Sequence, residues 1–341
     1  MALRLLLISE SISLVIYKNM LLFLNSKPFS FQLIRPLKTS QGIIYKKTGF
    51  LIKLQNKAGG IGWGEVAANH IPELKKCEAI LKSLGPTPSR AQLEETMRGS
   101  ATAIGFGIGA ALAELDCLVG NRSNQKWLTP LTSAYLLHDD ESPITQIDSI
   151  LKSHEPIKGN LTIKWKVGTK SNEVEEKMLN KILSHLPANA RLRIDANGSW
   201  DRQQATCWGD HLKNESKLEW IEQPLHANDI VGLLELANKL PIALDESLVS
   251  NPILRKTWSS WQIRRPVLEG DPRPLLKELN ENIGYRVIST SFETGIGRRW
   301  LNHLAALQQQ GPTPTAPGLA PGWCSNDPIF SRNPQLVWEA A

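Results

Sequence analysis

Three acidic residues recur at similar intervals in the second half of the chain, each at the end of a short apolar segment. Asp195 ends RLRID, Glu222 ends KLEWIE and Asp245 ends PIALD. Carboxylates that converge on one site repel and raise one another's pKa unless a cation lies between them. Ligation by oxygen alone, with positions left for water or a substrate carboxylate, favours Mg²⁺. We therefore expect Asp195, Glu222 and Asp245 to bind Mg²⁺, with Mn²⁺ as the alternative metal. The competing interpretation is that each acid is a solvated loop end or pairs with a local Lys or Arg.

Two lysines precede these acids, in the segment LTIKWKVG. Side chains alternate between the two faces of a strand, so Lys164 and Lys166 share one face. Ile163, Trp165 and Val167 then face the other way and pack on helices. A lysine must be unprotonated to remove a proton, and the like charges of Lys164 and a metal ion favour the neutral form of Lys166. The alternative, a pair of ordinary surface lysines, fits poorly with an apolar strand.

The same alternation brings two further polar residues to the inner face. Arg193 and Asn197 lie two positions before and after Asp195, whereas Leu192 and Ile194 face outward.

The segments that carry these residues alternate with amphipathic helical patterns. Strands that alternate with helices favour parallel βαβ units. The strand ends recur every 20 to 29 positions, at Lys166, Asp195, Glu222, Asp245, Arg265 and Ser289. Such steps predict a modified (β/α) TIM-type barrel over residues 126–310, whose active site lies at the carboxyl ends of the strands. An open doubly wound sheet is the alternative.

The rest of the chain predicts three further parts. Residues 30–65 alternate apolar and polar side chains around a turn at 56–60, and residues 71–120 are helical in pattern. We assign an α+β capping domain to residues 27–125. The Pro/Gly-rich segment 311–341 is expected to return to this cap. Residues 1–26 are expected to be an N-terminal extension, with Met20 as an alternative start.

Composition excludes several classes of protein. With 41% hydrophobic residues among 341, the chain has enough apolar material for a globular fold. The net charge of +6 is spread along the sequence, which argues against nucleic-acid binding. Arg4, Glu10 and Lys18 interrupt the leucine-rich start, so no membrane span is expected. Four cysteines without metal-site spacing indicate free thiols in a reducing compartment. We expect a cytoplasmic protein that acts on a small molecule.

The motifs KWK, IDAN, IEQP and LDES, in this order and spacing, resemble the enolase superfamily, specifically its muconate-lactonizing branch. Within that branch the chain is most similar to the o-succinylbenzoate synthases, which are dehydratases of menaquinone and phylloquinone synthesis. The resemblance spans about residues 27–330. It includes PLKTSQG and GWGEVA, which resemble the family's substrate-capping loops.

This resemblance implies a mechanism. Lys166 would be the general base that removes a proton α to a carboxylate, Lys164 would assist it, and the three acids would bind Mg²⁺. The expected reaction is syn dehydration of 2-succinyl-6-hydroxy-2,4-cyclohexadiene-1-carboxylate through an enediolate. Aromatisation of the ring makes that elimination strongly downhill.

One position departs from the family pattern. Most relatives have a lysine at the end of the sixth strand, in a sequence like IKP, whereas this chain has IRRP. Arg265 would stay protonated and cannot be a base, although its planar charge could face a ring. Epimerases of this branch need a base on each side of the carbon, so the arginine favours dehydration. If Pro266 shifts the register, Arg264 rather than Arg265 would face inward.

Other assignments implied by the resemblance concern substrate binding. They are Arg193, Asn197, Ser289, Ser291 and Gly318. Two rival functions stay open: an epimerase or cycloisomerase of the same branch, and a catalytically inactive scaffold protein.

Overall fold

The computed structural model describes residues 20–39, 42–68, 71–99, 102–120, 126–139, 141–153 and 161–341. Residues 1–19, most of the expected N-terminal extension, lie outside the described part. The alternative start at Met20 therefore stays a prediction. Residues 20–26 belong to the fold, because Leu22 is fully buried and the first strand begins at Phe23. The hairpin is therefore longer than the sequence pattern from Ser30 indicated.

Three antiparallel strands form the first sheet, in the order β1-β2-β3. They are β1 (Phe23–Thr39), β2 (Gly42–Gln55) and β3 (Ile61–Ala67). The turn between β2 and β3 is closed by Asn56, whose side-chain oxygen accepts a hydrogen bond from the Gly60 amide. The predicted hairpin is confirmed.

Three helices cover this sheet: α2 (Ile71–Leu84), α3 (Arg90–Gly99) and α4 (Thr102–Leu115). Helix α4 packs so closely on β3 that a Cβ at Gly62 or Gly64 would lie 1.9 or 1.8 Å from a carbonyl oxygen of α4. The segment GWGEVA is therefore a buried strand, as its alternation predicted, and the capping loop that the resemblance implied there is wrong. Part of PLKTSQG, the other segment assigned to a capping loop, lies outside the described residues. The glycines are there to allow the close approach of the helix.

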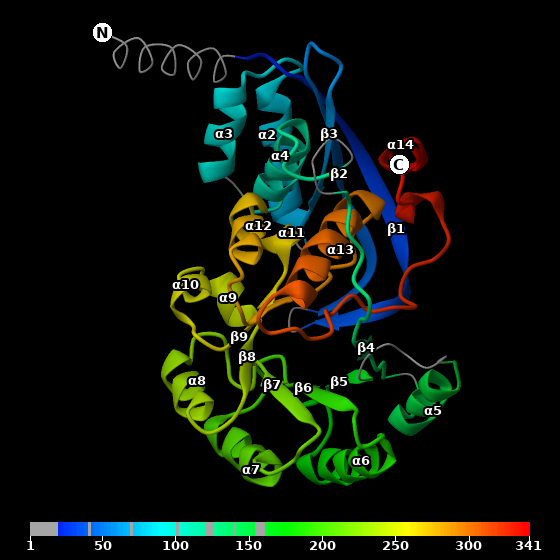
Figure 1. Ribbon diagram of the computed structural model, residues 1–341, viewed down its shortest axis with the longest axis vertical. Helices are drawn as coiled ribbons and strands as arrows, with labels where there is room; N and C mark the ends of the chain where they lie inside the picture. The colour runs from blue at the N-terminus through cyan, green and yellow to red at the C-terminus, as the bar shows by residue number, and fades with distance from the viewer. Residues whose placement is uncertain are drawn as a thin grey trace.

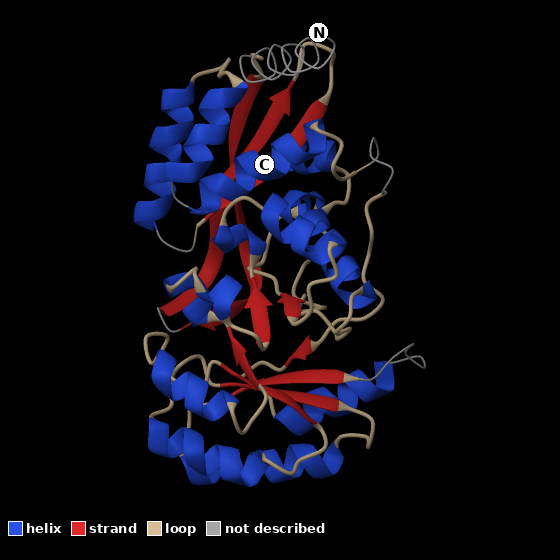
Figure 2. Ribbon diagram, turned by 60° about the vertical axis from the view of Figure 1, so that its left-hand side comes forward, coloured by secondary structure: helices blue, strands red, loops and turns tan. Residues whose placement is uncertain are grey.

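Seven parallel strands form the second sheet, in the order β10-β9-β8-β7-β6-β5-β4. They are β4 (Tyr135–Leu136), β5 (Thr162–Lys166), β6 (Arg191–Asp195), β7 (Leu218–Glu222), β8 (Ile242–Leu244), β9 (Trp261–Arg264) and β10 (Arg286–Ile288). Consecutive pairing without a change of direction excludes the doubly wound alternative. The modified (β/α) barrel with an α+β module is confirmed (Figures 1 and 2).

Helices lie between and after these strands, with α6, α7 and α8 along the outside of the barrel (Figure 1). They are α5 (Pro143–Ser153), α6 (Asn172–His185), α7 (Arg202–Leu212), α8 (Ile230–Ala237), α9 (Glu246–Ser250), α10 (Leu254–Thr257), α11 (Pro266–Glu269), α12 (Arg273–Asn280) and α13 (Gly295–Gln310).

A short segment around Gly318 joins the two edges of the curled sheet. The Gly318 amide donates to Ile288 of β10 at 2.8 Å, and the Thr290 amide donates to the Gly318 carbonyl at 2.9 Å. On the other side, the Ala134 amide donates to the Pro317 carbonyl, just before β4. The barrel is thereby closed by a segment too short to count as a strand.

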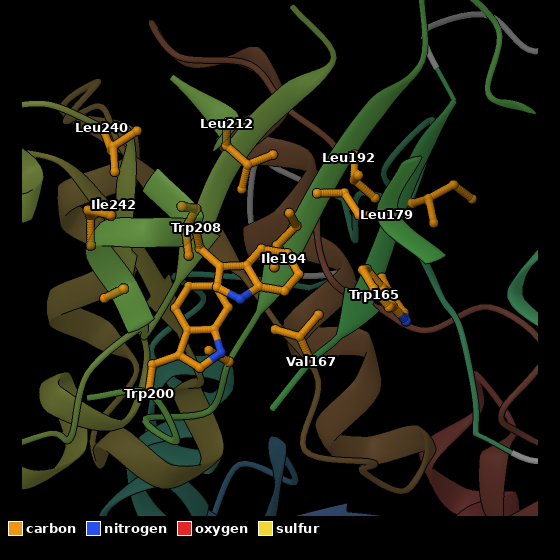
Figure 3. Packing of buried hydrophobic residues seen from close by; sticks show 14 of the residues in the cluster. Trp165, Val167, Leu179, Leu192, Ile194, Trp200, Trp208, Leu212, Leu240 and Ile242 are labelled. Atoms are coloured by element: carbon orange, nitrogen blue, oxygen red, sulfur yellow. The ribbon is translucent and has the colours of Figure 1, made fainter. Parts of the chain in front are cut away.

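The outer face of the barrel strands carries the largest apolar core. Trp165, Ile194 and Ile242 cluster with helix residues such as Leu179 of α6 and Leu212 of α7 (Figure 3). Trp200 and Trp208 stack there with ring centroids 4.9 Å apart. This confirms the expected alternation, because the residues between these apolar ones face the barrel interior.

The C-terminal segment contains a 3-10 turn (Pro328–Phe330) and α14 (Pro334–Ala340) and lies against the first sheet. The rings of Phe330 and Phe31 are 4.9 Å apart, and those of Trp338 and Trp63 are 5.7 Å apart. The boundaries of the domains stay predictions. In the described part of the chain, no helix combines the length and apolar character that crossing a bilayer requires.

Candidate active site

A cavity of about 440 Å³ opens at the carboxyl ends of the barrel strands. It lies beneath the module formed by β1–β3 and α2–α4, which is called the first module below (Figure 1). Every residue predicted for the site lines the cavity: Lys164, Lys166, Arg193, Asp195, Asn197, Glu222, Asp245, Arg265, Ser289, Ser291 and Gly318. The strand register explains this, since Lys166 pairs with Asp195 and Asp195 pairs with Glu222 across adjacent strands. Short parallel strands thus convert regular spacing in sequence into proximity in space.

Lys164 lies between two of the predicted metal ligands. Its Nζ is 2.8 Å from Asp195 Oδ2 and 2.5 Å from Glu222 Oε1. Both acids are almost completely inaccessible, with 0% and 1% of their surface exposed. Buried charges persist only when they are paired, so the ammonium group stabilises this pair of carboxylates.

Arg265 makes a two-pronged contact with the third acid. Its Nε lies 2.8 Å from Asp245 Oδ1, and its Nη2 lies 2.5 Å from Asp245 Oδ2. Its Nη1 also donates to the carbonyl of Thr290 at 2.5 Å. Arg264 points away from the cavity and pairs with Glu269 at 2.6 Å. Arg265 is therefore the arginine that faces the site, and the alternative register with Arg264 inward is wrong.

These contacts determine the charge state of the site. Burial lowers the pKa of Lys164, but Asp195 and Glu222 outweigh burial and raise it, so Lys164 stays protonated. Burial raises the pKa of Glu222 to about 7, although Lys164 opposes the rise. Burial alone would raise the pKa of Asp245 as well, yet the Arg265 guanidinium holds it below its ordinary value.

A fourth acid, Glu246, belongs to the site and was not predicted. Its Oε1 accepts a hydrogen bond from Asn197 Nδ2 at 3.0 Å, and its buried Oε2 has no hydrogen-bond partner in the part of the chain that the structure describes. Burial, together with Asp245 and Asp195, raises the pKa of Glu246 to about 8. Two adjacent acids at a strand end, in LDES, were the available signal.

The donor set fits a magnesium ion in its chemistry. Asp195, Glu222 and Asp245 present buried carboxylate oxygens at the ends of three successive strands. Within the described residues, however, no three Asp, Glu, His or Cys side chains are arranged around a common point as metal ligands. Lys164 and Arg265 lie within ion-pair distance of these oxygens. Their positive charges would oppose a cation bound by the same acids.

Arg193 faces the cavity but is held by the protein. Its guanidinium stacks 3.9 Å from the centroid of the Trp220 ring and pairs with Glu219 at 2.6 Å. It also donates to the Ala316 carbonyl at 2.6 Å, two residues before Gly318. These contacts place the barrel-closing segment, and a direct role for Arg193 in substrate binding stays a prediction.

The opposite wall of the cavity comes from the first module and from the loop after β10. Ile43 and Ile44 of β2 line it, as do Glu73 and Thr102 at the starts of α2 and α4. Phe292 completes the apolar part of this wall. None of these residues was predicted, because their place depends on how the two modules pack.

Comparisons with known proteins agree with this geometry. The family model described as "Enolase C-terminal domain-like" matches residues 157–258. An o-succinylbenzoate synthase of Thermosynechococcus vestitus is 30% identical over 288 residues, which cover 80% of this chain and 85% of the relative. This chain belongs to the o-succinylbenzoate synthase family of the enolase superfamily.

Membership of the o-succinylbenzoate synthase family makes the chain an enzyme of the lyase class. The crystal structure of o-succinylbenzoate synthase from Thermosynechococcus elongatus BP-1, complexed with Mg in the active site, is similar with a TM-score of 0.77. It is 27% identical and covers 94% of this chain and 100% of its own. An N-succinyl-L-Arg/Lys racemase of Bacillus cereus is 25% identical over 65% of this chain and 64% of its own. Relatives with a different reaction thus share the barrel, so the reaction must be argued from the site.

Proposed function

We propose that this protein catalyses the Mg²⁺-dependent syn dehydration of 2-succinyl-6-hydroxy-2,4-cyclohexadiene-1-carboxylate to o-succinylbenzoate. The observation that carries the proposal is the composition of the cavity. Lys166 is present at the end of β5, three acids end the next strands, and an arginine takes the place opposite. A site with one lysine base and one permanent cation suits an elimination, which needs a single acid–base group.

Lys166 performs both proton transfers in this proposal. Its neutral amine takes the proton from the ring carbon that bears the carboxylate. The electron pair of that C–H bond then forms the new ring double bond, while the bond to the neighbouring hydroxyl breaks. The ammonium of Lys166 returns the proton to the departing hydroxyl, which leaves as water, so Lys166 ends the cycle neutral.

Asp195, Glu222 and Asp245 would hold Mg²⁺. When bound, the ion supplies positive charge beside the substrate carboxylate, where negative charge grows as the proton leaves. Lys164 and Arg265 keep the same acids paired until then, and their fixed charges stay close to the reacting carboxylate.

The remaining parts of the cavity suit the rest of the substrate. Ile43, Ile44 and Phe292 offer apolar surface to the ring. Ser289 and Ser291 line the cavity near Gly318, and the buried Ser291 hydroxyl has no hydrogen-bond partner within the described residues. We assign the succinyl carboxylate to this side, together with Asn197 as a further polar contact. A place in menaquinone or phylloquinone synthesis, in the cytoplasm, is part of the proposal.

An epimerase is the second candidate, supported by the similarity to the N-succinyl-L-Arg/Lys racemase. Epimerisation removes a proton from one face of a carbon and returns one to the other face, so it needs two groups that can exchange protons. Burial lowers the pKa of Arg265, but Asp245 raises it by more, so Arg265 keeps its proton. This favours the dehydratase.

The test incubates the purified protein with Mg²⁺ in D₂O, once with the cyclohexadiene substrate and once with N-succinyl-lysine. The proposal predicts aromatic product from the cyclohexadiene substrate, and no deuterium at the α-carbon of N-succinyl-lysine. Deuterium in the amino acid without aromatic product would favour the epimerase.

A further inference from the structure

The loop that links β10 to α13, residues 289–294, forms part of the cavity wall and adopts a strained backbone. Phe292 has a φ of 65°, in the left-handed region that side chains with a Cβ rarely adopt. Its ring lines the cavity and packs 5.3 Å from the ring of Trp323. Such a conformation persists only when its surroundings hold it in place.

Part of that support comes from within the loop and from the barrel. Glu293 accepts hydrogen bonds from the Ser291 amide and from the Thr290 hydroxyl, both at 2.6 Å. Thr290 Oγ1 also accepts from the Phe292 amide at 2.9 Å. Arg265 donates to the Thr290 carbonyl, which connects the loop to the reacting end of the cavity.

The rest of the support comes from Glu65, in the first module. Its Oε2 accepts hydrogen bonds from the Thr294 hydroxyl at 2.5 Å and from the Thr294 and Gly297 amides, both at 3.0 Å. Glu65 is fully buried, and a buried carboxylate is tolerated only with such donors. Gly297 leaves room for this contact, because a Cβ there would lie 2.7 Å from Glu65 Oε2.

We infer that Glu65 is a positioning residue for catalysis: it holds the loop 289–294 from the first module and thereby sets Ser291 and Phe292 at the cavity wall. The carboxyl oxygens of Glu65 replace the missing hydrogen-bond acceptors at the start of α13. Packing of the first module on the barrel is in this way coupled to the shape of the substrate pocket. The choice of o-succinylbenzoate as the ligand in the experiment below rests on the proposed function.

The chain offers a matched control for Glu65. Glu114 is a largely buried acid of the first module, with 9% of its side-chain surface exposed, and it also contacts α13, through an ion pair with Arg299. Arg299 lies five residues beyond Thr294, and Glu114 makes none of the contacts that hold the loop. Glu114→Gln therefore reports the cost of a lost contact between the modules without a change in the loop.

The experiment compares Glu65→Gln, Gly297→Ala and Glu114→Gln with the parent protein in two measurements. The first is amide hydrogen exchange of residues 289–297 without ligand, and the second is the Kd for o-succinylbenzoate in Mg²⁺. We expect exchange about ten times faster and a Kd about ten times higher for Glu65→Gln and Gly297→Ala. Glu114→Gln should lower Tm but change the exchange rate and the Kd by less than two-fold each. If Glu65→Gln does not fold, Gly297→Ala still tests whether the loop shapes the pocket, since its Cβ would meet Glu65 and the Glu293 side chain of the loop together.

Two outcomes would overturn the inference. One is exchange and Kd unchanged in both loop variants, and the other is the same change in Glu114→Gln, which would indicate only loss of general stability. If the parent protein does not bind o-succinylbenzoate but the exchange results are as expected, the proposed ligand is wrong and the support of the loop by Glu65 stands.

Discussion

Arg265 holds Asp245 through two parallel contacts from one edge of its guanidinium, with Nε 2.8 Å from Oδ1 and Nη2 2.5 Å from Oδ2. Both residues end neighbouring segments of the barrel, and Asp245 is 3% exposed. The arginine thus neutralises an acid that the proposed function assigns to Mg²⁺. Positive charges repel, so the guanidinium and the metal ion compete for Asp245.

Replacement of Arg265 by Met should separate metal binding from catalysis. Without the competing charge, we expect Mg²⁺ to bind about ten times more tightly, which corresponds to about 1.4 kcal/mol. Turnover should fall, since the reacting carboxylate loses a nearby positive charge. Calorimetric titration of the protein with MgCl₂ measures the affinity, and weaker Mg²⁺ binding in the variant would contradict this account of Arg265.

Replacement of Lys164 by Met should make the protein depend on Mg²⁺ for stability. Removal of one partner from a buried ion pair costs about 3–5 kcal/mol, because the other charge is left unpaired. We expect a loss of about that size in chelator and a smaller loss in saturating MgCl₂, because a second cation can replace the ammonium. Urea unfolding under both conditions checks this, with the exposed Lys170→Met as the control. A loss that Mg²⁺ leaves unchanged would argue against a metal site at Asp195 and Glu222.

His303 should make stability fall in mild acid. It is fully buried in α13, where its Nδ1 accepts a hydrogen bond from the Leu128 amide. Burial lowers the pKa of His303 to about 4. Between about pH 6.5 and 4 the unfolded chain therefore binds the extra proton, so this contribution to stability is present above pH 6.5 and is lost as the pH falls.

The measurement is urea unfolding of the parent protein and of His303→Asn across this pH range. The free energy of unfolding of the parent should fall more steeply than that of the variant, by at most about 1.4 kcal/mol per pH unit. Parallel curves for the two proteins would show that His303 is not the group responsible.

Much of the site could be predicted because its geometry depends on regular strands. Alternation along β5 and β6 put Lys164, Lys166 and Asp195 on the inner face, and the constant step between strands put the acids at one end of the barrel. The ligand role of the acids and the base role of Lys166 stay predictions. The fold, by contrast, is confirmed.

The parts that were missed depend on contacts between distant segments. The alternation predicted a strand up to Glu65, and the family resemblance implied a substrate-capping loop there. Neither could indicate that Glu65 contacts Thr294 and Gly297, more than 200 residues further along the chain. Phe292 has no local pattern, and its place follows from contacts with Trp323 and with the loop around it. The pairing of Lys164 with Asp195 could not be read from spacing, since the same alternation is consistent with a metal ion between the acids.

The close packing of β3 on α4 gives a prediction about stability. A methyl group at Gly64 would lie 1.8 Å from the Gly107 carbonyl, so Gly64→Ala must push the helix from the sheet. We expect a loss of about 2–4 kcal/mol in the free energy of unfolding. Gly99→Ala is the control, since nothing lies within 4 Å of its Cβ position and a helical alanine is favoured. Equal stability of the two variants in urea would contradict the packing described for β3.

The most direct test of the central claim is the rate at which the protein forms o-succinylbenzoate from 2-succinyl-6-hydroxy-2,4-cyclohexadiene-1-carboxylate, with and without Lys166. The account predicts Mg²⁺-dependent appearance of aromatic ring absorbance, unchanged in the exposed control Lys170→Ala and reduced by at least about 10³-fold in Lys166→Ala. No product from the parent protein, or the same rate from a folded Lys166→Ala variant, would contradict it.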